Sequence, residues 1–158
     1  MRIYIESTIP SYLTARPPRD LLQAARQQLT LDWWEFRRHA HELFTSQITP
    51  DEISAGESEM ARARLERMAP LPLLDLTAEG ERLGDTIVEA GILPSNAYTD
   101  AAHIAVATVH RMDILLTWNC RHIANGEIEV RLRRHIISRG YELPLVCTPE
   151  ELMGETYG

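Results

Sequence analysis

The segment from Asn96 to His122 restricts the fold most, because it joins a helical pattern directly to a short buried strand. Its first part carries small and apolar residues at three-to-four-residue spacing, which is the pattern of an amphipathic helix. These residues are Ile104, Ala105, Thr108 and Val109. The run Ile114–Thr117 follows, and it is too short for a helix and apolar enough to be buried on both faces. A helix that leads into a doubly buried strand predicts an α/β protein.

The remainder of the chain alternates short apolar runs with helical patterns in the same way. Strands are predicted at residues 2–6, 43–48, 71–76 and 144–147. Helices are predicted at residues 11–14, 20–43, 49–56, 57–68, 77–90, 126–139 and from residue 148 onward. Such alternation is typical of a mostly parallel sheet that is covered by helices on both faces.

Length and composition fit one globular domain that spans residues 1–158. The chain is 44% hydrophobic and 25% charged. Its apolar runs fall well short of the roughly 20 residues that cross a bilayer. The first residues predict a strand rather than a secretory signal, and Cys120 and Cys147 are too few for a disulfide framework. We therefore expect a cytoplasmic protein that does not bind membranes.

The net charge of −7 argues against a protein that coats nucleic acid electrostatically. The same charge is compatible with an enzyme that brings phosphate to an acidic site through a metal ion. All 16 basic residues are Arg, whose forked guanidinium group matches phosphate. We favour the base composition of the source genome as the explanation for the absence of Lys.

Three acids and one amide occupy positions where a parallel sheet collects side chains. Glu6 ends the first strand, Glu52 follows the second, and Asn119 follows the central strand. Asp100 lies in the first turns of the helix before that strand. In open α/β sheets, ligands bind at the carboxyl ends of the strands. Carboxylates gathered there repel one another unless a cation neutralises them, and oxygen ligands suit Mg²⁺ or Mn²⁺.

Two of these acids also have a simple structural explanation. Glu52 completes a capping-box spacing with Thr49, and Asp100 is favourable near the amino end of a helix. Glu6 is harder to explain in this way, because an acid that closes an apolar strand is costly to bury. From spacing alone, a metal site and purely structural roles both remain open.

At these positions the chain resembles the PIN-domain family, and within it the VapC-like toxins of bacterial and archaeal toxin–antitoxin pairs. The resemblance rests on four segments that follow the family's order: Ile5–Thr8, Ser46–Glu52, Thr99–Ala105 and Leu116–Asn119. They match a strand ending in an acid, a strand-to-helix segment with its Glu, an Asp before an Ile-Ala helix, and a strand-ending Thr with Asn two residues later.

The resemblance implies a three-layer α/β/α sandwich and a Mg²⁺- or Mn²⁺-dependent endoribonuclease that hydrolyses RNA phosphodiester bonds. It implies that Glu6, Glu52 and Asp100 hold the metal in the catalytic site. Asn119 would be a weaker or water-mediated ligand in the same site. The resemblance also implies two protein partners, a second copy of the chain in a homodimer and a small antitoxin.

Two further pairs of residues are expected to assist the acids. By the resemblance, Thr8 and Thr117 would support the cluster by hydrogen bonding without binding the metal themselves. Arg16 and Arg19 follow the first acidic strand, where they would contact RNA phosphate. Solvated surface charge is an equally good explanation for both arginines.

Two residues depart from the family's pattern. Glu6 stands where most relatives have Asp, and its extra methylene moves the carboxylate by more than an ångström. Asn119 is neutral where many relatives have Asp, which weakens any second metal site. A second function therefore remains open, that of a catalytically degenerate PIN-fold protein that acts as a protein- or RNA-binding module.

Other conspicuous residues receive weaker predictions. Trp33 and Trp34 are adjacent on a helix, so we expect one to be partly exposed, either over a loop or neighbouring helix or in a partner interface. The pair is therefore a candidate for the surface that contacts the antitoxin. His103 lies one turn from Asp100 and could touch the site, but we favour a position on the helix surface beside it. The segment from Cys120 to His122 is too sparse for a zinc site. The chain lacks the glycine-rich loops that bind nucleotide cofactors.

Overall fold

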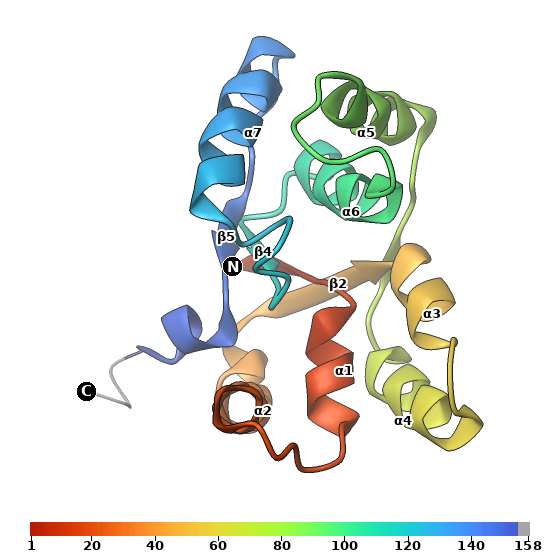
Figure 1. The fold of residues 1–158 in the computed structure, drawn as a ribbon, viewed down its shortest axis with the longest axis vertical. Coiled ribbons are helices and arrows are strands. Elements are labelled where there is room, and N and C mark those ends of the chain that lie inside the picture. The colour runs from red at the N-terminus through yellow and green to blue at the C-terminus, as the bar shows by residue number, and fades with distance from the viewer. Residues whose placement is uncertain (155–158) are drawn as a thin grey trace.

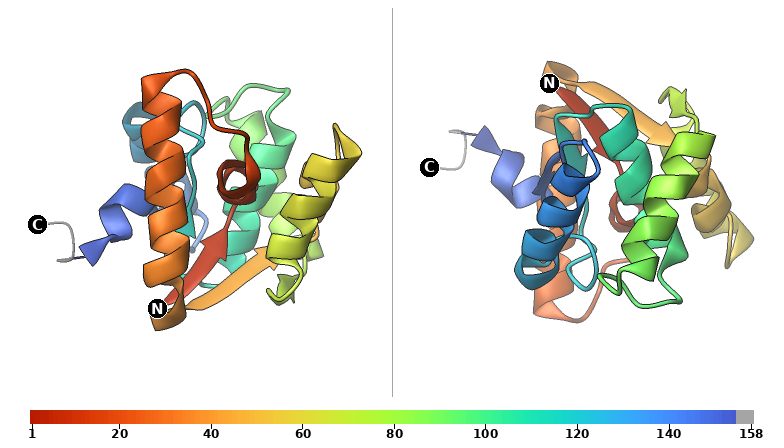
Figure 2. Two further views of the ribbon diagram at one scale, coloured as in Figure 1. Left: turned by 90° about the horizontal axis from the view of Figure 1, so that it is seen from below. Right: turned by 90° about the horizontal axis from the view of Figure 1, so that it is seen from above.

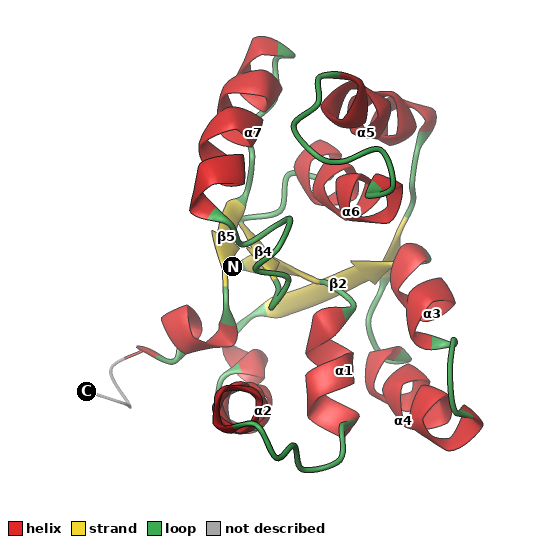
Figure 3. Cartoon of the chain, in the orientation of Figure 1, coloured by secondary structure: helices red, strands yellow, loops and turns green. Residues whose placement is uncertain are grey.

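A sheet of five short strands forms the centre of the structure, a computed structural model that describes residues 1–154. The strands are β1 Arg2–Ile5, β2 Glu42–Ser46, β3 Leu73–Leu74, β4 Ile114–Leu116 and β5 Leu145–Cys147. Their order across the sheet is β3-β2-β1-β4-β5, and every neighbouring pair is parallel (Figure 1, Figure 3). The carboxyl ends of all the strands therefore meet at one edge of the sheet.

Helices cover both faces of this sheet (Figure 1, Figure 2). One face carries α5 Ala78–Glu89, α6 Tyr98–Val109 and α7 Gly126–Ser138. The other carries α1 Thr8–Thr14, α2 Leu21–Phe36 and α4 Ser58–Met68, while α3 Ile48–Ile53 lies at the end of β2. Two 3₁₀ turns, η1 Arg38–Ala40 and η2 Pro149–Leu152, complete the elements. The predicted α/β class with a parallel central sheet is confirmed. No helix within residues 1–154 combines the length and apolar character that crossing a bilayer requires.

Successive strand residues enter two separate cores, because side chains alternate between the faces of a sheet. Tyr4 and Leu115 pack into the core beneath α5, α6 and α7. Ile3, Ile5 and Leu116 pack into the core beneath α1 and α2. The central strands are thus apolar on both faces, as the run at 114–117 predicts.

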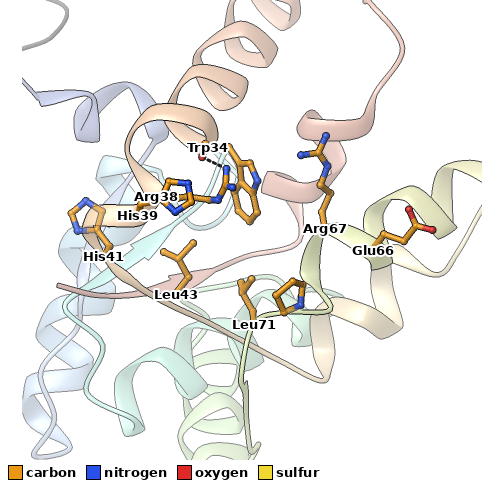
Figure 4. A pocket seen from close by; sticks show the side chains of 9 residues that line it. Trp34, Arg38, His39, His41, Leu43, Glu66, Arg67 and Leu71 are labelled. Atoms are coloured by element: carbon orange, nitrogen blue, oxygen red, sulfur yellow. Dashed lines mark hydrogen bonds between the residues drawn. The ribbon is translucent and has the colours of Figure 1, made fainter.

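Trp33 and Trp34 both lie in the core under α2, with exposed fractions of 0% and 6%. The expectations that one of them is partly exposed and that the pair forms an antitoxin surface are therefore wrong. Adjacent helix residues can both be buried here because Arg38 covers Trp34, with its guanidinium carbon 5.2 Å from the ring centroid. Figure 4 shows this indole and Arg38 in the wall of a pocket of about 500 Å³ between α2, β2 and α4.

The helix predicted at residues 20–43 ends earlier, at Phe36. Asp20 caps its start as its sequence position suggests, because its side chain accepts a hydrogen bond of 2.9 Å from the Leu22 amide. A 3₁₀ turn then leads into β2, whose first residue, Glu42, pairs with Arg2. Pairing with β1 therefore decides where the strand begins, which a local pattern does not reveal.

The capping box predicted for Thr49 and Glu52 is absent. The helix α3 begins at Ile48, one residue before Thr49, and its N-cap residue Gln47 makes no side-chain cap. Thr49 is buried inside the first turn. Glu52 consequently has no capping role, and the structural explanation for this acid fails.

Candidate metal centre

Glu6 follows β1 directly and is buried, with only 2% of its surface exposed. One carboxylate oxygen, Oε2, accepts three hydrogen bonds: from the Thr8 amide at 3.1 Å, the Thr8 hydroxyl at 2.5 Å and the Thr117 hydroxyl at 2.7 Å. These donors stabilise a buried negative charge. Within residues 1–154 the other oxygen, Oε1, accepts no hydrogen bond. Glu6 is thus fixed through one oxygen and free to bind a ligand through the other.

Glu52 lies on α3 and reaches the same place from the end of β2. Its Oε1 accepts hydrogen bonds from the Ser7 hydroxyl at 2.5 Å and from His103 Nε2. Burial raises the pKa of Glu52, but its interactions with His103 and Ser7 together outweigh burial and bring this pKa below its ordinary value. Among the described residues, Glu52 Oε2 has no hydrogen-bond partner. Glu52 therefore repeats the arrangement of Glu6.

His103 lies inside the cluster and is fully buried, with 0% of its surface exposed. Its Nδ1 is 2.7 Å from the Tyr4 hydroxyl, and its Nε2 contacts Glu52 and lies 3.2 Å from the Ser7 hydroxyl. The prediction that His103 is on the helix surface is wrong, because α6 is buried on most of its circumference. The sequence does contain a signal for the burial of His103, because α6 is apolar around almost its whole circumference and such helices are buried.

Glu6, Glu52 and His103 form one compact group. Each offers a ligand atom, and these atoms all lie within 4.8 Å of one another. The two acids come from the ends of neighbouring parallel strands, as the spacing analysis anticipated. Their two unpartnered oxygens fit a hard divalent cation such as Mg²⁺ or Mn²⁺, which prefers oxygen ligands.

Asp100 lies next to this group but does not belong to it. Its Oδ1 accepts a hydrogen bond of 3.1 Å from Asn119 Nδ2, and its Oδ2 is 2.6 Å from His122 Nδ1. The backbone N–H of Asn119 donates to the Thr117 hydroxyl at 2.9 Å, and this hydroxyl donates to Glu6. Asp100 is therefore linked to Glu6 through hydrogen bonds, with both of its own oxygens occupied.

The supporting residues lie where the resemblance implies. Thr8 and Thr117 both donate to Glu6, and the Thr8 hydroxyl also accepts a hydrogen bond of 2.8 Å from the Trp118 amide. The loop after β4 is thus fastened to the loop after β1. Arg16 and Arg19 are both exposed, and Arg16 pairs with Glu57 at 3.3 Å.

His122 is a residue that the sequence analysis missed. Its segment was considered only as a zinc site, whereas its ring holds Asp100 with 19% of the side chain exposed. Within the described part of the chain, His122 Nε2 makes no hydrogen bond. The pairing depends on the turn after β4, in which the His122 amide donates to Asn119 Oδ1 at 3.0 Å, and no sequence spacing reveals this contact.

One surface pocket of the protein includes Glu52 in its lining. Next to Glu52, a hollow of about 450 Å³ is lined by Ile48, Asp51, Tyr98, Thr99 and Ala102 as well. A larger hollow, about 1390 Å³, lies at the opposite edge of the sheet, where Asp113 precedes β4 and Leu145 begins β5. We attach the chemistry to the smaller hollow, because the free carboxylate oxygens belong to the same edge.

Comparison with known proteins identifies the fold. No family model matches the chain, and no curated protein matches it by sequence. Among solved structures, a chain of VapBC2 from Rickettsia felis, bound to a DNA fragment from its promoter, matches with a TM-score of 0.59. The match has 14% sequence identity and covers 94% of this chain and 98% of that chain. The chain therefore shares the fold of this matched chain. At this identity the VapBC likeness concerns the fold alone.

Proposed function

We propose that this protein is a metal-dependent endoribonuclease, the toxin of a toxin–antitoxin pair. The observation that carries the proposal is the convergence of Glu6 and Glu52, each held through one oxygen and open at the other. Glu6 is buried and Glu52 is exposed on one side, and a cation between two carboxylates so close together would relieve their repulsion. The VapBC-like fold supports the same function.

Each residue in the site has a distinct proposed role. Glu6 and Glu52 would hold Mg²⁺ or Mn²⁺ through their free oxygens, and Asp100 would complete the catalytic site with Asn119. When bound, the ion would supply a more acidic water and neutralise charge on the phosphate. Thr8 and Thr117 keep the Glu6 carboxylate in one orientation, which matters because small displacements of catalytic groups cost large factors in rate.

The partners of this protein are also proposals. The solved relative is a VapBC2 assembly with promoter DNA, which supports a small antitoxin as the partner of this chain. We propose a homodimer that acts on RNA in the cytoplasm, built from a single domain over residues 1–158. Arg16 and Arg19 remain proposed contacts to RNA phosphate, in keeping with their exposure.

One observation favours the second candidate, a degenerate PIN-fold protein that binds a protein or RNA without cutting. Both oxygens of Asp100 are occupied, by Asn119 and His122. A third acid that cannot reach the ion would leave the site with two carboxylates. Such a site would bind metal weakly and hydrolyse RNA slowly.

A cleavage assay with matched variants separates these functions. We expect the protein to cut RNA with Mg²⁺ or Mn²⁺, to stop with EDTA, and to resume when the ion is restored. Glu6→Gln and Glu52→Gln should each lose more than about 100-fold in rate, more than the loss of an outer partner causes. Glu35→Gln, an exposed change on α2, should cleave like the natural chain. Cleavage that survives in both site variants, or is absent under all conditions, would refute the nuclease.

A further inference from the structure

The buried ring of His103 raises a question that the acids alone do not answer, namely whether it binds the ion or serves Glu52. We infer that Ser46, Tyr4 and His103 form a one-way chain of hydrogen-bond donors that positions the Glu52 carboxylate. On this inference His103 is a positioning residue and not a ligand of the metal. The inference rests on the proposed metal site, but its first test needs no metal.

The chain of contacts runs through the interior from one element to the next. The Tyr4 hydroxyl on β1 lies 2.7 Å from Ser46 Oγ on β2 and 2.7 Å from His103 Nδ1 on α6. All three side chains have 0% exposure. Water therefore does not compete for these hydrogen bonds, and each proton must have a partner within the chain itself.

The direction of donation follows from counting protons, starting at Glu52. An ionised carboxylate only accepts hydrogen bonds, so the contact with His103 requires a proton on Nε2. A neutral imidazole carries one ring proton, so Nδ1 must accept from Tyr4. The single proton of Tyr4 is then used, and Ser46 must donate to the tyrosine oxygen.

The same geometry argues against His103 as a ligand. Its Nε2 and Glu52 Oε1 are in direct hydrogen-bond contact, which leaves no room for an ion between these two atoms. A ligand nitrogen would need an unprotonated Nε2, the reverse of the tautomer just derived. The oxygens that remain open are Glu6 Oε1 and Glu52 Oε2. The ion would then have oxygen ligands only, which suits Mg²⁺ and Mn²⁺ better than zinc.

The first test is the tautomer of His103 in the metal-free protein, read from the ¹⁵N NMR shifts of its two ring nitrogens near neutral pH. We expect a protonated Nε2 and a bare Nδ1. A ring protonated only on Nδ1, or on both nitrogens, would overturn the inference. This result is independent of whether any ion binds.

The second test measures Mn²⁺ affinity by calorimetry on folded variants. Tyr4→Phe removes the donor to Nδ1 while keeping the ring, and it should weaken Mn²⁺ binding by about 10- to 100-fold. Tyr141→Phe is the matched control, because the Tyr141 hydroxyl bonds to Glu79 on the exposed surface. His103→Gln keeps a donor toward Glu52 and should retain more Mn²⁺ affinity than His103→Leu. Equal affinity in the natural chain and Tyr4→Phe would contradict the positioning role.

Electron paramagnetic resonance of bound Mn²⁺ then distinguishes a failure of the positioning role of His103 from a failure of the proposed metal site. We expect no coupling between the Mn²⁺ electron spin and a histidine nitrogen in the natural chain. If such coupling is seen and disappears in His103→Gln, His103 binds the ion. That result would overturn the inference but support the metal site. If Mn²⁺ does not bind the natural chain at all, the proposed nuclease fails, whereas the tautomer still decides the donor chain.

Discussion

The hydrogen bonds to Glu6 show how a buried charge is made tolerable. Three donors from Thr8 and Thr117 converge on one oxygen of this acid. In return, the Thr117 hydroxyl accepts from the Asn119 amide. One threonine side chain therefore links the strand-ending acid of β1 to the loop after β4.

Replacing Thr117 with Val tests the strength of this link. The change removes a donor from a buried carboxylate at almost constant volume, so we expect a loss of about 1–3 kcal/mol in the free energy of unfolding, measured in urea. Thr108→Val is the matched control, because the buried Thr108 hydroxyl has no partner within residues 1–154. That change should be neutral or slightly stabilising. Equal losses in both variants would contradict the role given to Thr117.

Glu52 predicts a pH dependence of stability. Its pKa in the folded protein lies below the unfolded value of about 4.3, because its interactions with His103 and Ser7 together outweigh burial. The unfolded state therefore binds more protons in this range, and stability from these contacts is complete above that pH. It is lost as the pH falls through the folded pKa. Urea midpoints between about pH 5 and about pH 3 should vary less in Glu52→Gln than in the natural chain.

The control for the pH experiment is Glu59→Gln, which alters an exposed acid of α4. This variant should follow the natural chain over the whole range. A Glu52→Gln variant with an unchanged pH dependence would mean that the hydrogen bonds from His103 and Ser7 do not favour the ionised carboxylate.

At the residue scale, position along a strand carries much of the information. Glu6 and Glu52 could be identified because each follows an apolar run, and residues after parallel strands share an edge. His103 and His122 could not, since their contacts with Glu52 and Asp100 depend on how α6 and the turn after β4 pack. Helical spacing alone does not place a side chain in three dimensions.

At the scale of elements, predictions are accurate where a local signal marks the start or the end of a helix. The helix predicted at residues 77–90 is α5: Thr77 caps its start by accepting from the Gly80 amide at 3.1 Å, and Gly91 follows its end with a φ of 67°. The predicted end of α2 at residue 43 was wrong, because the segment Arg37–His41 contains no comparable signal that stops a helix. Pairing of β2 with β1 supplies the missing information.

Two glycines near α5 should respond in opposite ways to the same change. Gly84 lies inside the helix, where an added Cβ would meet Ala101 and Ala105 at 3.6–3.7 Å, ordinary contact distances. Gly84→Ala should therefore stabilise the protein by about 0.5–1 kcal/mol. Gly91→Ala should cost about 1 kcal/mol, because its positive φ disfavours any Cβ even in open space. Urea unfolding of both variants checks the signs, and the same sign in both would contradict this explanation.

For the whole molecule, alternation of strands and helices predicts a parallel sheet but not the order of its strands. The order β3-β2-β1-β4-β5 places the first strand in the middle, between β2 and β4. That arrangement depends on pairing between segments about 40 and 110 residues apart, such as Tyr4 with Phe44 and with Leu115. Local sequence patterns do not predict strand pairing between segments so far apart in the chain.

Binding of an ion at the proposed centre should stabilise the whole fold. At a free Mn²⁺ concentration of about 100 times Kd, the free energy of unfolding should rise by about 2.7 kcal/mol. Thermal melts with and without EDTA would show this as a higher midpoint. The double variant Glu6→Gln, Glu52→Gln is the control and should melt at one temperature under both conditions. A shift that persists in this variant would place the ion elsewhere.

The central position of β1 also has a consequence for the life of the chain in a cell. Glu6 is translated about 110 residues before β4 ends, yet its amide donates to Leu116 and its carboxylate accepts from Thr117. A nascent chain that has not reached β4 has the first two acids without the strand that fixes one of them. For the proposed ribonuclease, the site would therefore stay incomplete until β4 and Thr117 have been translated.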